Sequence, residues 1–387
     1  MNKDKYVFAQ LTAFLDRNKF NHIVRKFNGD KYVKHFTCWN QLLALMFGQL
    51  SNRESLRDLI VALDAHRSKC YHLGMCKNVS KSSLARVNQN RDYRIFEEFA
   101  YFLISEARQK RVANIFKLEG NVYAFDSTTI DLCLSVFWWA KFRKNKGGIK
   151  MHTLFDIETQ IPAFIHVSEA SAHDSTAMKE IPFESNSYYV FDRAYNHFKM
   201  LYKMHQIGSF FIIRAKKNLQ YNTIKWKRRL PEGVLSDQII ELTGFYPRQY
   251  YPKRLRLVKY WDEEQNREFV FLTNAMHISA LQVAELYKNR WQIELFFKWI
   301  KQHLRIKKFW GTSENAVRIQ IYAAICAYCL VAIVQKDMQI ERSTYEILQI
   351  LSISLTDKTH LGDLFAKTKF QNDKDRFRLN EPNLFNF

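Results

Sequence analysis

Two aspartates stand in segments where a carboxylate is costly unless it has a partner. Asp126 lies inside the apolar segment NVYAFDSTTI, and Asp192 follows the apolar run YYVF. An ionised carboxylate is tolerated there when it is exposed on one face or bound to a cation. Two carboxylates at close range repel each other, and a divalent cation removes that conflict. The pair therefore predicts a metal site, provided that the fold brings the two residues together.

A third acid, Glu294, lies among cations and aromatic residues in YKNRWQIELFFKWIK. At about 100° per residue, a helix places five side chains of this stretch within roughly 80° of one another; they are Tyr287, Arg290, Glu294, Lys298 and Lys301. A surface ladder of salt bridges would give the same pattern. Together with the two aspartates, the pattern favours a third metal ligand beside phosphate-binding cations.

The ligand types indicate which metal and which chemistry to expect. Carboxylate oxygens without His or Cys ligands are typical of Mg²⁺ or Mn²⁺ sites. A pair of such ions activates a water or a 3′-hydroxyl and stabilises the leaving oxygen at a phosphodiester. We therefore expect metal-dependent phosphoryl transfer on a nucleic acid.

The charge of the chain supports a polyanionic partner. The 387 residues include 59 Lys and Arg against 38 Asp and Glu, a formal net charge of +21. A surplus of this size favours nucleic acid first and an anionic membrane second. The N-terminus lacks a signal-peptide pattern, and the apolar run at residues 319–334 is expected to be a buried helix rather than a membrane span. We expect a cytoplasmic protein with reduced, buried cysteines, including Cys326 and Cys329.

The elements that must position the acids begin at about residue 120. Segments 121–130, 148–157 and 161–170 have strand patterns and are separated by short turns, which indicates antiparallel pairing. They are followed by a short helix (173–181), a strand (187–195), a second helix and a strand that ends near residue 217. This order predicts an α/β fold with a mixed sheet flanked by helices. The first and fourth strands are neighbours in such a sheet, so their aspartates come side by side.

The rest of the chain divides by composition. We expect a helical N-terminal domain for DNA binding or an accessory role, a catalytic core in two parts, a basic β-rich insertion between them and a C-terminal helical segment with a tail. The corresponding ranges are 1–115, 116–213 and 276–335 for the core, 214–275 for the insertion, and 336–387. The second part of the core carries the Glu294 helix, expected to run without a break from about residue 279 to 303.

Three further groups of residues are candidates for contacts with DNA or the metal site. A short helix capped by Ser82 or Ser83 carries Arg, Asn and Gln, the side chains that read bases, although a solvated polar helix explains it as well; these residues are Arg86, Asn88, Gln89, Asn90 and Arg91. The stretch FWWAKFRKNKGG, with Arg143, Lys144 and Lys146, suits a DNA-contacting loop, unless its tryptophans pack on the core. His173 and Asp174 are possible extra members of the metal site, although Asp174 equally suits a helix cap.

The order of residues in the Glu294 helix resembles a known family. Tyr287, Arg290, Glu294 and Lys301 match the Y-(2)-R-(3)-E-(6)-K signature of the insertion-sequence DDE transposases called the IS-four family. The contexts DSTTI and FDRAY are similar to the family's two aspartate motifs, with Ala194 where many relatives have Gly. KGGIKMH, residues 146–152, resembles its second-strand segment.

The resemblance implies a ribonuclease-H-like core with a β-rich insertion before the glutamate. It implies that Asp126, Asp192 and Glu294 bind Mg²⁺, for which Mn²⁺ can substitute. It also implies that Tyr287, Arg290 and Lys301 grip the phosphates at the cleavage site. The N-terminal part looks like the accessory domain with which such transposases bind the ends of their element.

The implied activity is cut-and-paste transposition. The enzyme would cut at terminal inverted repeats, form a hairpin, reopen it and join the 3′-hydroxyl ends to target DNA, as a homodimer that pairs two ends. Trp291 and Trp226 are candidates to hold a flipped base, although both residue types more often pack in cores or on surfaces. Two alternatives stay open: a metal-dependent nuclease without strand transfer, and an inactive DNA-binding repressor.

Overall fold

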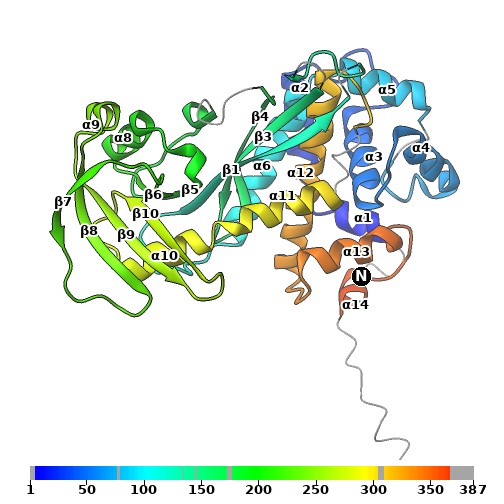
Figure 1. Cartoon of the computed structure of the whole chain (residues 1–387). Coiled ribbons are helices and arrows are strands. Elements are labelled where there is room, and N and C mark those ends of the chain that lie inside the picture. The colour runs from blue at the N-terminus through cyan, green and yellow to red at the C-terminus, as the bar shows by residue number, and fades with distance from the viewer. Residues whose placement is uncertain are drawn as a thin grey trace, which may run out of the picture.

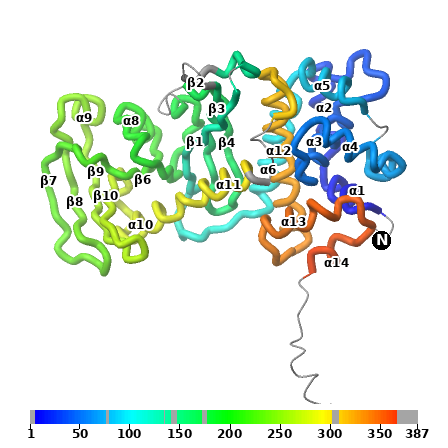
Figure 2. The backbone as a smooth tube through the Cα atoms, turned by 45° about the vertical axis from the view of Figure 1, so that its right-hand side comes forward, coloured from blue at the N-terminus to red at the C-terminus, as the bar shows by residue number. Residues whose placement is uncertain are grey.

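A long sheet and a bundle of helices form the two lobes of the protein. The computed structural model describes residues 5–75, 79–133, 135–143, 146–171, 177–303 and 309–366. Figures 1 and 2 show an elongated molecule with the sheet at one end and the helices at the other. In both views α11 (Trp291–His303) runs along the sheet toward the helical lobe.

The helical lobe is built around one apolar helix, α12 (Glu314–Asp337). Every residue from Ile319 to Val334 is buried, because the helix is apolar on all sides and needs cover all round. By length and composition α12 could cross a membrane, but 94% of its most apolar window is buried in the protein. The expectation of a buried helix is confirmed. Cys326 and Cys329 lie inside it as free thiols, and burial raises the pKa of each.

Helices from both ends of the chain complete this lobe, some packed on α12 and others on the helices around it. They are α1 (Val7–Thr12), α2 (Arg17–Lys26), α3 (Cys38–Leu50), α4 (Leu56–Ala65), the 3₁₀ turn η1 (Arg67–Lys69), α5 (Lys81–Asn90), α6 (Arg94–Lys110), α13 (Thr344–Ser354) and α14 (Leu361–Phe365). The helical character predicted for the N-terminal part is therefore present. Ser80, rather than Ser82 or Ser83, caps α5 by accepting the N–H of Ser83. The predicted tail beyond residue 366 lies outside the described residues.

The sheet has the mixed pairing that the strand order predicts. Its first five strands are β1 (Val122–Leu132), β2 (Lys141–Arg143), β3 (Lys146–Asp156), β4 (Ile161–Glu169) and β5 (Tyr188–Phe191), followed by β6 (Phe210–Arg214). β1 pairs antiparallel with β3, and β3 with β4, whereas β1, β5 and β6 are parallel neighbours. The sheet order is β2-β3-β1-β5-β6-β10-β9-β8-β7, with β4 on β3.

Helices cover both faces of this sheet. Successive side chains of a strand point to opposite faces, and on β1 the side chains of both faces are buried. On β1, Val122 and Ala124 belong to the cluster that includes α10 (Ala280–Lys288) and α11. Tyr123 and Phe125 belong instead to the cluster on the other face, which includes α8 (Phe198–Ile207). A strand that packs on helices on both sides reads as a nearly continuous apolar run.

The basic insertion continues the same sheet. Its elements are β7 (Tyr221–Trp226), β8 (Val234–Leu242), the unpredicted helix α9 (Phe245–Tyr250), β9 (Leu255–Asp262) and β10 (Arg267–Thr273). β10 pairs antiparallel with β6, with Phe271 opposite Arg214. The insertion is β-rich as expected, and its last strand lies directly beside the core.

The structure differs from the sequence prediction at two places, and a third predicted element lies partly outside the described residues. The predicted fourth strand ends at Phe191 and gives way to the 3₁₀ turn η3 (Arg193–Tyr195). The loop after β1 contains the short unpredicted strand β2. Of the helix predicted at 173–181, residues 172–176 lie outside the described residues, and a 3₁₀ turn, η2 (Met178–Glu180), follows them.

The Glu294 helix is broken, which contradicts the expectation of one helix from 279 to 303. The N–H groups of Arg290, Gln292 and Ile293 each bond at 3.1 Å to the carbonyl three residues earlier. Such i to i+3 bonds tighten the turn relative to an α-helix. The junction therefore separates α10, with Tyr287, from α11, with Glu294 and Lys301, and Arg290 lies at the break.

Candidate active site

The register of two parallel strands brings the two aspartates together. Phe125 of β1 and Phe191 of β5 are the last paired residues of the two strands, and an aspartate follows each. Beyond this point β5 ends, and Asp192 leads into η3. β1 continues along β3, with Asp126 opposite Thr153. Parallel neighbours carry their carboxyl ends to the same edge, so this adjacency follows from the topology.

Asp126 is largely enclosed by protein and has two hydrogen-bond donors. Its Oδ1 accepts the N–H of Ser127 at 2.8 Å, and its Oδ2 accepts Arg290 Nη1 at 2.9 Å. Burial raises the pKa of Asp126 to about 6. The bonds from Ser127 and the charge of Arg290 oppose this shift, whereas the charges of Asp192 and Glu294 add to it. The three acids therefore act on one another electrostatically.

Arg290 bridges two of the acids. Its Nη2 donates to Glu294 Oε1 at 2.5 Å while Nη1 holds Asp126. The side chain of Arg290 is 14% exposed, whereas that of Glu294 is 57% exposed. Arg290 Nε is buried, and among the described residues it has no acceptor. A buried donor without an acceptor is costly, and this one suits an oxygen supplied by a ligand.

Tyr287 and Lys301 approach the two aspartate strands from the two sides of the helix break. The Tyr287 hydroxyl donates to Asp192 Oδ1 at 3.4 Å, and burial raises the pKa of this tyrosine. Its ring packs on Phe271 of β10 at 4.8 Å between centroids. Lys301 Nζ donates to the carbonyl of Thr129, three residues beyond Asp126 on β1, at 2.8 Å. Tyr287, Arg290 and Lys301 thus each contact Asp192 or β1, and Arg290 links Glu294 to Asp126.

A cavity of about 390 Å³ opens beside these residues. Asp192, Tyr287, Arg290, Trp291 and Glu294 line one side of it. Arg214 and Arg267 line another, and each guanidinium lies over the ring of Phe269, at 5.0 and 4.3 Å. The cavity combines carboxylates, cations and aromatic faces, as a site for a phosphate chain with an unpaired base requires.

The sequence interpretation missed this role for Arg214 and Arg267. Arg214 is the first residue of the predicted basic insertion, and no role beyond that was assigned to it. Arg267 alternates with Phe269 and Phe271 along β10, and residues two apart on a strand share a face. That alternation was the available signal, but only the pairing of β10 with β6 shows that the face lies beside Asp192.

The remaining candidate residues are spread over the molecule. Trp291 is 50% exposed and lines the cavity, whereas Trp226 is 60% exposed at the end of β7 and does not. Lys298 is exposed on α11 and Arg86 on α5. Arg143 and Lys146 lie in β2 and β3 without described side chains, and Lys144, His173 and Asp174 lie outside the described residues.

Some aromatic side chains of the loop after β1 pack on the protein, and others are exposed. Phe137 is buried, and Trp139 Nε1 donates to the carbonyl of Thr312 at 2.7 Å. Trp138, between them, is 75% exposed. The two interpretations of this loop therefore apply to different residues: two of its aromatic side chains dock on the protein, and one faces solvent.

The donor set suits a divalent cation, although the acids are not grouped around a metal position. In the part of the chain that the structure describes, no three His, Cys, Asp or Glu side chains stand close enough to hold an ion. The Arg290 guanidinium lies where positive charge is needed, between Asp126 and Glu294. Two of the three carboxylates thus already hold a cation, and carboxylate oxygens are the donors that Mg²⁺ and Mn²⁺ prefer.

The sequence matches known families over most of its length. Residues 117–330 match the family described as Transposase DDE domain, and residues 3–76 match a domain of unknown function. A candidate transposase of Sinorhizobium fredii is 33% identical over 279 residues, which cover 70% of this chain and 75% of the relative. A candidate transposase for an insertion sequence element of Synechocystis is 24% identical and covers 88% of this chain and 96% of the relative.

The match of the DDE domain covers more than half of the 387 residues and includes all three acids and the four signature residues. Its mixed sheet and flanking helices agree with a ribonuclease-H-like fold. The chain therefore belongs to the DDE-domain transposases, enzymes that cleave and transfer DNA strands, as the spacing of its signature implied.

Proposed function

We propose that this transposase cuts at the terminal inverted repeats of an insertion sequence and joins the 3′-hydroxyl ends to target DNA. Asp126, Asp192 and Glu294 are the catalytic triad. The observation that carries the proposal is the register of β1 and β5, after which both aspartates emerge at one edge. The Arg290 bridge to Glu294 supports the third member.

The triad holds divalent metal, on which DDE transposases depend. We assign Mg²⁺, with Mn²⁺ as a substitute, because all three donors are carboxylates. Two bound ions would activate the attacking water or 3′-hydroxyl and stabilise the leaving oxygen of the phosphodiester.

The other residues of the site bind and orient DNA. Tyr287 holds the Asp192 carboxylate through its hydroxyl. Arg290 turns its buried Nε toward a phosphate oxygen, which supplies the acceptor that this donor lacks. Lys301 and Lys298 place positive charge along α11 for the same strand. Trp291, at the cavity, stacks on the base that the hairpin step displaces.

The partner is double-stranded DNA, first the element's ends and then the target. The +21 charge makes binding strongly dependent on salt. Cut-and-paste through a hairpin pairs two ends, so a homodimer forms on synapsis, in the bacterial cytoplasm at the nucleoid. Residues 1–115 bind the ends, 116–213 and 276–335 form the catalytic core, 214–275 form the insertion, and 336–387 complete the C-terminal segment.

The test uses the full-length protein, a labelled duplex with the inverted repeat that flanks the gene, Mg²⁺ or Mn²⁺, and a target plasmid. We expect cleavage at the repeat, a hairpin on a denaturing gel and labelled plasmid. Asp126→Asn should bind the duplex and cut nothing, while Asp131→Asn, an exposed acid further along β1, keeps activity. Nicked product without joining indicates a nuclease, and cleavage by Asp126→Asn contradicts the assigned triad.

A further inference from the structure

One exposed helix face in the N-terminal lobe has the chemistry of a base-reading surface. Along α5, Leu84 and Asn88 are buried, whereas Arg86, Gln89 and Asn90 are exposed. Arg, Gln and Asn are the side chains that form paired hydrogen bonds with bases in the major groove. No acid occurs from Ser80 to Arg91, so the face does not repel phosphates.

A buried polar network fixes the other face of α5 to α3. Gln41 Nε2 donates to Asn88 Oδ1 at 2.7 Å, and Arg91 Nη1 donates to Gln41 Oε1 at 2.9 Å. Arg91 also donates to the carbonyl of Phe36. Asn88 and Arg91 are therefore structural, and the expectation that they read bases was wrong. Such a network costs free energy when it is broken, so it holds the helix in one orientation.

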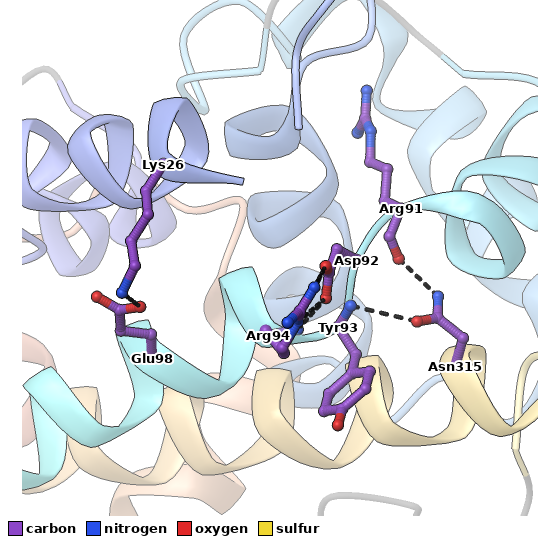
Figure 3. Close-up of polar contacts among 7 residues, drawn as sticks. All are labelled: Lys26, Arg91, Asp92, Tyr93, Arg94, Glu98 and Asn315. Carbon is purple, nitrogen blue, oxygen red and sulfur yellow. Dashed lines mark hydrogen bonds and ion pairs between the residues drawn. The ribbon is translucent and has the colours of Figure 1, made fainter. Parts of the chain in front are cut away.

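Asn315 of α12 holds the end of α5. It lies in the first turn of α12, and its Nδ2 donates to the carbonyls of Asn88, Gln89 and Arg91 at 3.0, 3.2 and 2.6 Å. Its Oδ1 accepts the N–H of Tyr93 at 3.2 Å. Figure 3 shows Asn315 reaching from α12 to the turn between α5 and α6. Carbonyls at the end of a helix have no hydrogen-bond donor within the helix. Here the side chain of Asn315 supplies the donors.

The same segment also contacts the loop that follows the strand of Asp126. Trp139, in the connection from β1 to β2, donates to the carbonyl of Thr312, three residues before Asn315. Figure 2 shows α5, β2 and β3 at the same upper end of the molecule. Two hydrogen-bonded contacts thus connect the C-terminal end of α5, through the segment from Thr312 to Asn315, with the loop that follows β1.

We propose that the exposed face of α5 reads base pairs of the transposon end, and that Asn315 is a positioning residue that holds this helix in register with the Asp126 site. The idea rests on the proposed function and names the surface that recognises the DNA. The occupant is the major groove of a duplex, because the face offers two base-reading amides and a guanidinium. A protein partner would gain little from these exposed polar ends.

The reading surface is tested by selection from a library of randomised duplexes with the full-length protein. The parent should enrich a motif. Arg86→Ala/Gln89→Ala should lose the preference at two or three adjacent base pairs and bind the motif about tenfold or more weakly, because each paired contact discriminates between bases. The matched control Lys336→Ala/Gln349→Ala changes exposed residues remote from α5. It should keep both the base preference and the affinity of the parent. A parent without a motif, or an unchanged motif in the α5 variant, overturns the proposal.

Asn315 is tested by comparing cleavage at the selected motif with Mn²⁺-dependent nicking of an unrelated plasmid. Asn315→Ala should enrich the same motif but cut there about tenfold less, or at neighbouring phosphates, since the bonds that fix α5 are lost. Nicking of the unrelated plasmid should not change, and thermal unfolding verifies that the variant is folded. An equal loss in both assays, or in neither, overturns the positioning role.

The two proposals fail in different ways. If the parent selects a motif that the α5 variant has lost, yet cuts no DNA, the proposed catalysis fails and the reading surface stands. If the parent cuts and joins its ends but the α5 variant selects the same motif, only the reading surface fails.

Discussion

Arg290 donates to Asp126 across 2.9 Å, although the two residues are 164 positions apart in the chain. The same guanidinium holds Glu294 with its other terminal nitrogen. One cation therefore joins a strand acid to a helix acid and neutralises part of their repulsion. If Asp126 and Glu294 bind metal as proposed, each carboxylate would exchange Arg290 for a divalent cation, and the guanidinium would become available to phosphate.

Replacing Arg290 should weaken the metal-free protein and abolish cutting. In Arg290→Met the two acids lose their shared cation, which should cost roughly 1–3 kcal/mol of unfolding free energy in denaturant titrations. Cleavage at the element's ends should fall at least about a hundredfold, because a charged phosphate contact is lost. Arg342→Met, at a similarly shielded arginine with an i,i+4 partner, should keep cleavage. Normal cutting by Arg290→Met would remove this residue from the site.

The metal response should depend on pH through Asp126. Burial raises its pKa to about 6, so below that pH a proton competes with metal for the carboxylate. Without metal, the folded state holds this proton more tightly than the unfolded state, whose carboxyl ionises near 3.9. The contribution of this group to stability is thus present below the unfolded pKa and is lost as pH rises through 6.

Differential scanning fluorimetry measures this competition. Mn²⁺ should raise Tm strongly at pH 7.5 and little at pH 5, because Asp126 is ionised only at the higher pH. In Asp126→Asn the increase in Tm on addition of Mn²⁺ should be small and the same at both pH values. An equal response of the parent at both pH values would contradict the involvement of this carboxylate.

The buried ion pair of the insertion should control stability and the start of α10. Arg256 and Asp237 are 1% and 4% exposed, and their side chains bond at 2.8 and 2.7 Å. Arg256 also donates to the carbonyl of Ile278, immediately before the capping residue Ser279. Burial pushes the pKa of Asp237 up, but the hydrogen bonds and charges of Arg256 and Lys227 together outweigh it and hold that pKa below its ordinary value.

Arg256→Met should therefore lower the unfolding free energy by about 3 kcal/mol, the low end for a broken buried pair, since the Asp237 carboxylate then keeps only Lys227, at 3.1 Å. Arg256→Met/Asp237→Leu should recover part of this loss, as measured by urea titration. The parent's pair contributes stability above the unfolded pKa of Asp237, and this is lost as pH falls through the lower folded value. A double variant as unstable as the single one would point to the carbonyl bonds instead.

Replacing each of the two candidate tryptophans should affect the rate of hairpin formation differently. Trp291 lines the cavity beside Asp192, whereas Trp226 lies at the end of β7, outside it. Trp291→Ala should slow hairpin formation on a pre-nicked end by about tenfold or more, because base stacking on an aromatic contributes about 1–3 kcal/mol. Trp226→Ala is the matched control and should leave that rate unchanged. Gel electrophoresis of labelled ends measures both, and the reverse order would move the base-binding role to the insertion.

Local patterns were sufficient for most of the core. Alternating and continuous apolar runs predicted β1, β3, β4, β5 and β6, and their order predicted that Asp126 and Asp192 would be adjacent. Helical periodicity predicted that Tyr287, Arg290 and Glu294 would face the same way. These predictions depend only on the spacing of residues within short segments, which can be seen directly in the sequence.

Other features depend on contacts between distant segments. The break at Arg290 could not be predicted, because YKNRWQIELFFKWIK has no Pro or Gly and good helical periodicity. It arises where α10 must pack on β5 and β6 while α11 passes along β1. The buried Asn88 and Arg91 looked like surface residues because their partner, Gln41, is about fifty positions away.

The family, the mixed sheet and the three candidate acids could be predicted from the sequence alone, because these follow from residue types and spacings within single elements. Only the tertiary structure decided that Arg290 bridges Asp126 and Glu294, that β10 brings Arg267 beside Asp192, and that Asn315 holds α5. The physical reason is that a hydrogen bond or ion pair depends on distances of about 3 Å between atoms, and folding alone sets those distances for residues far apart in the chain.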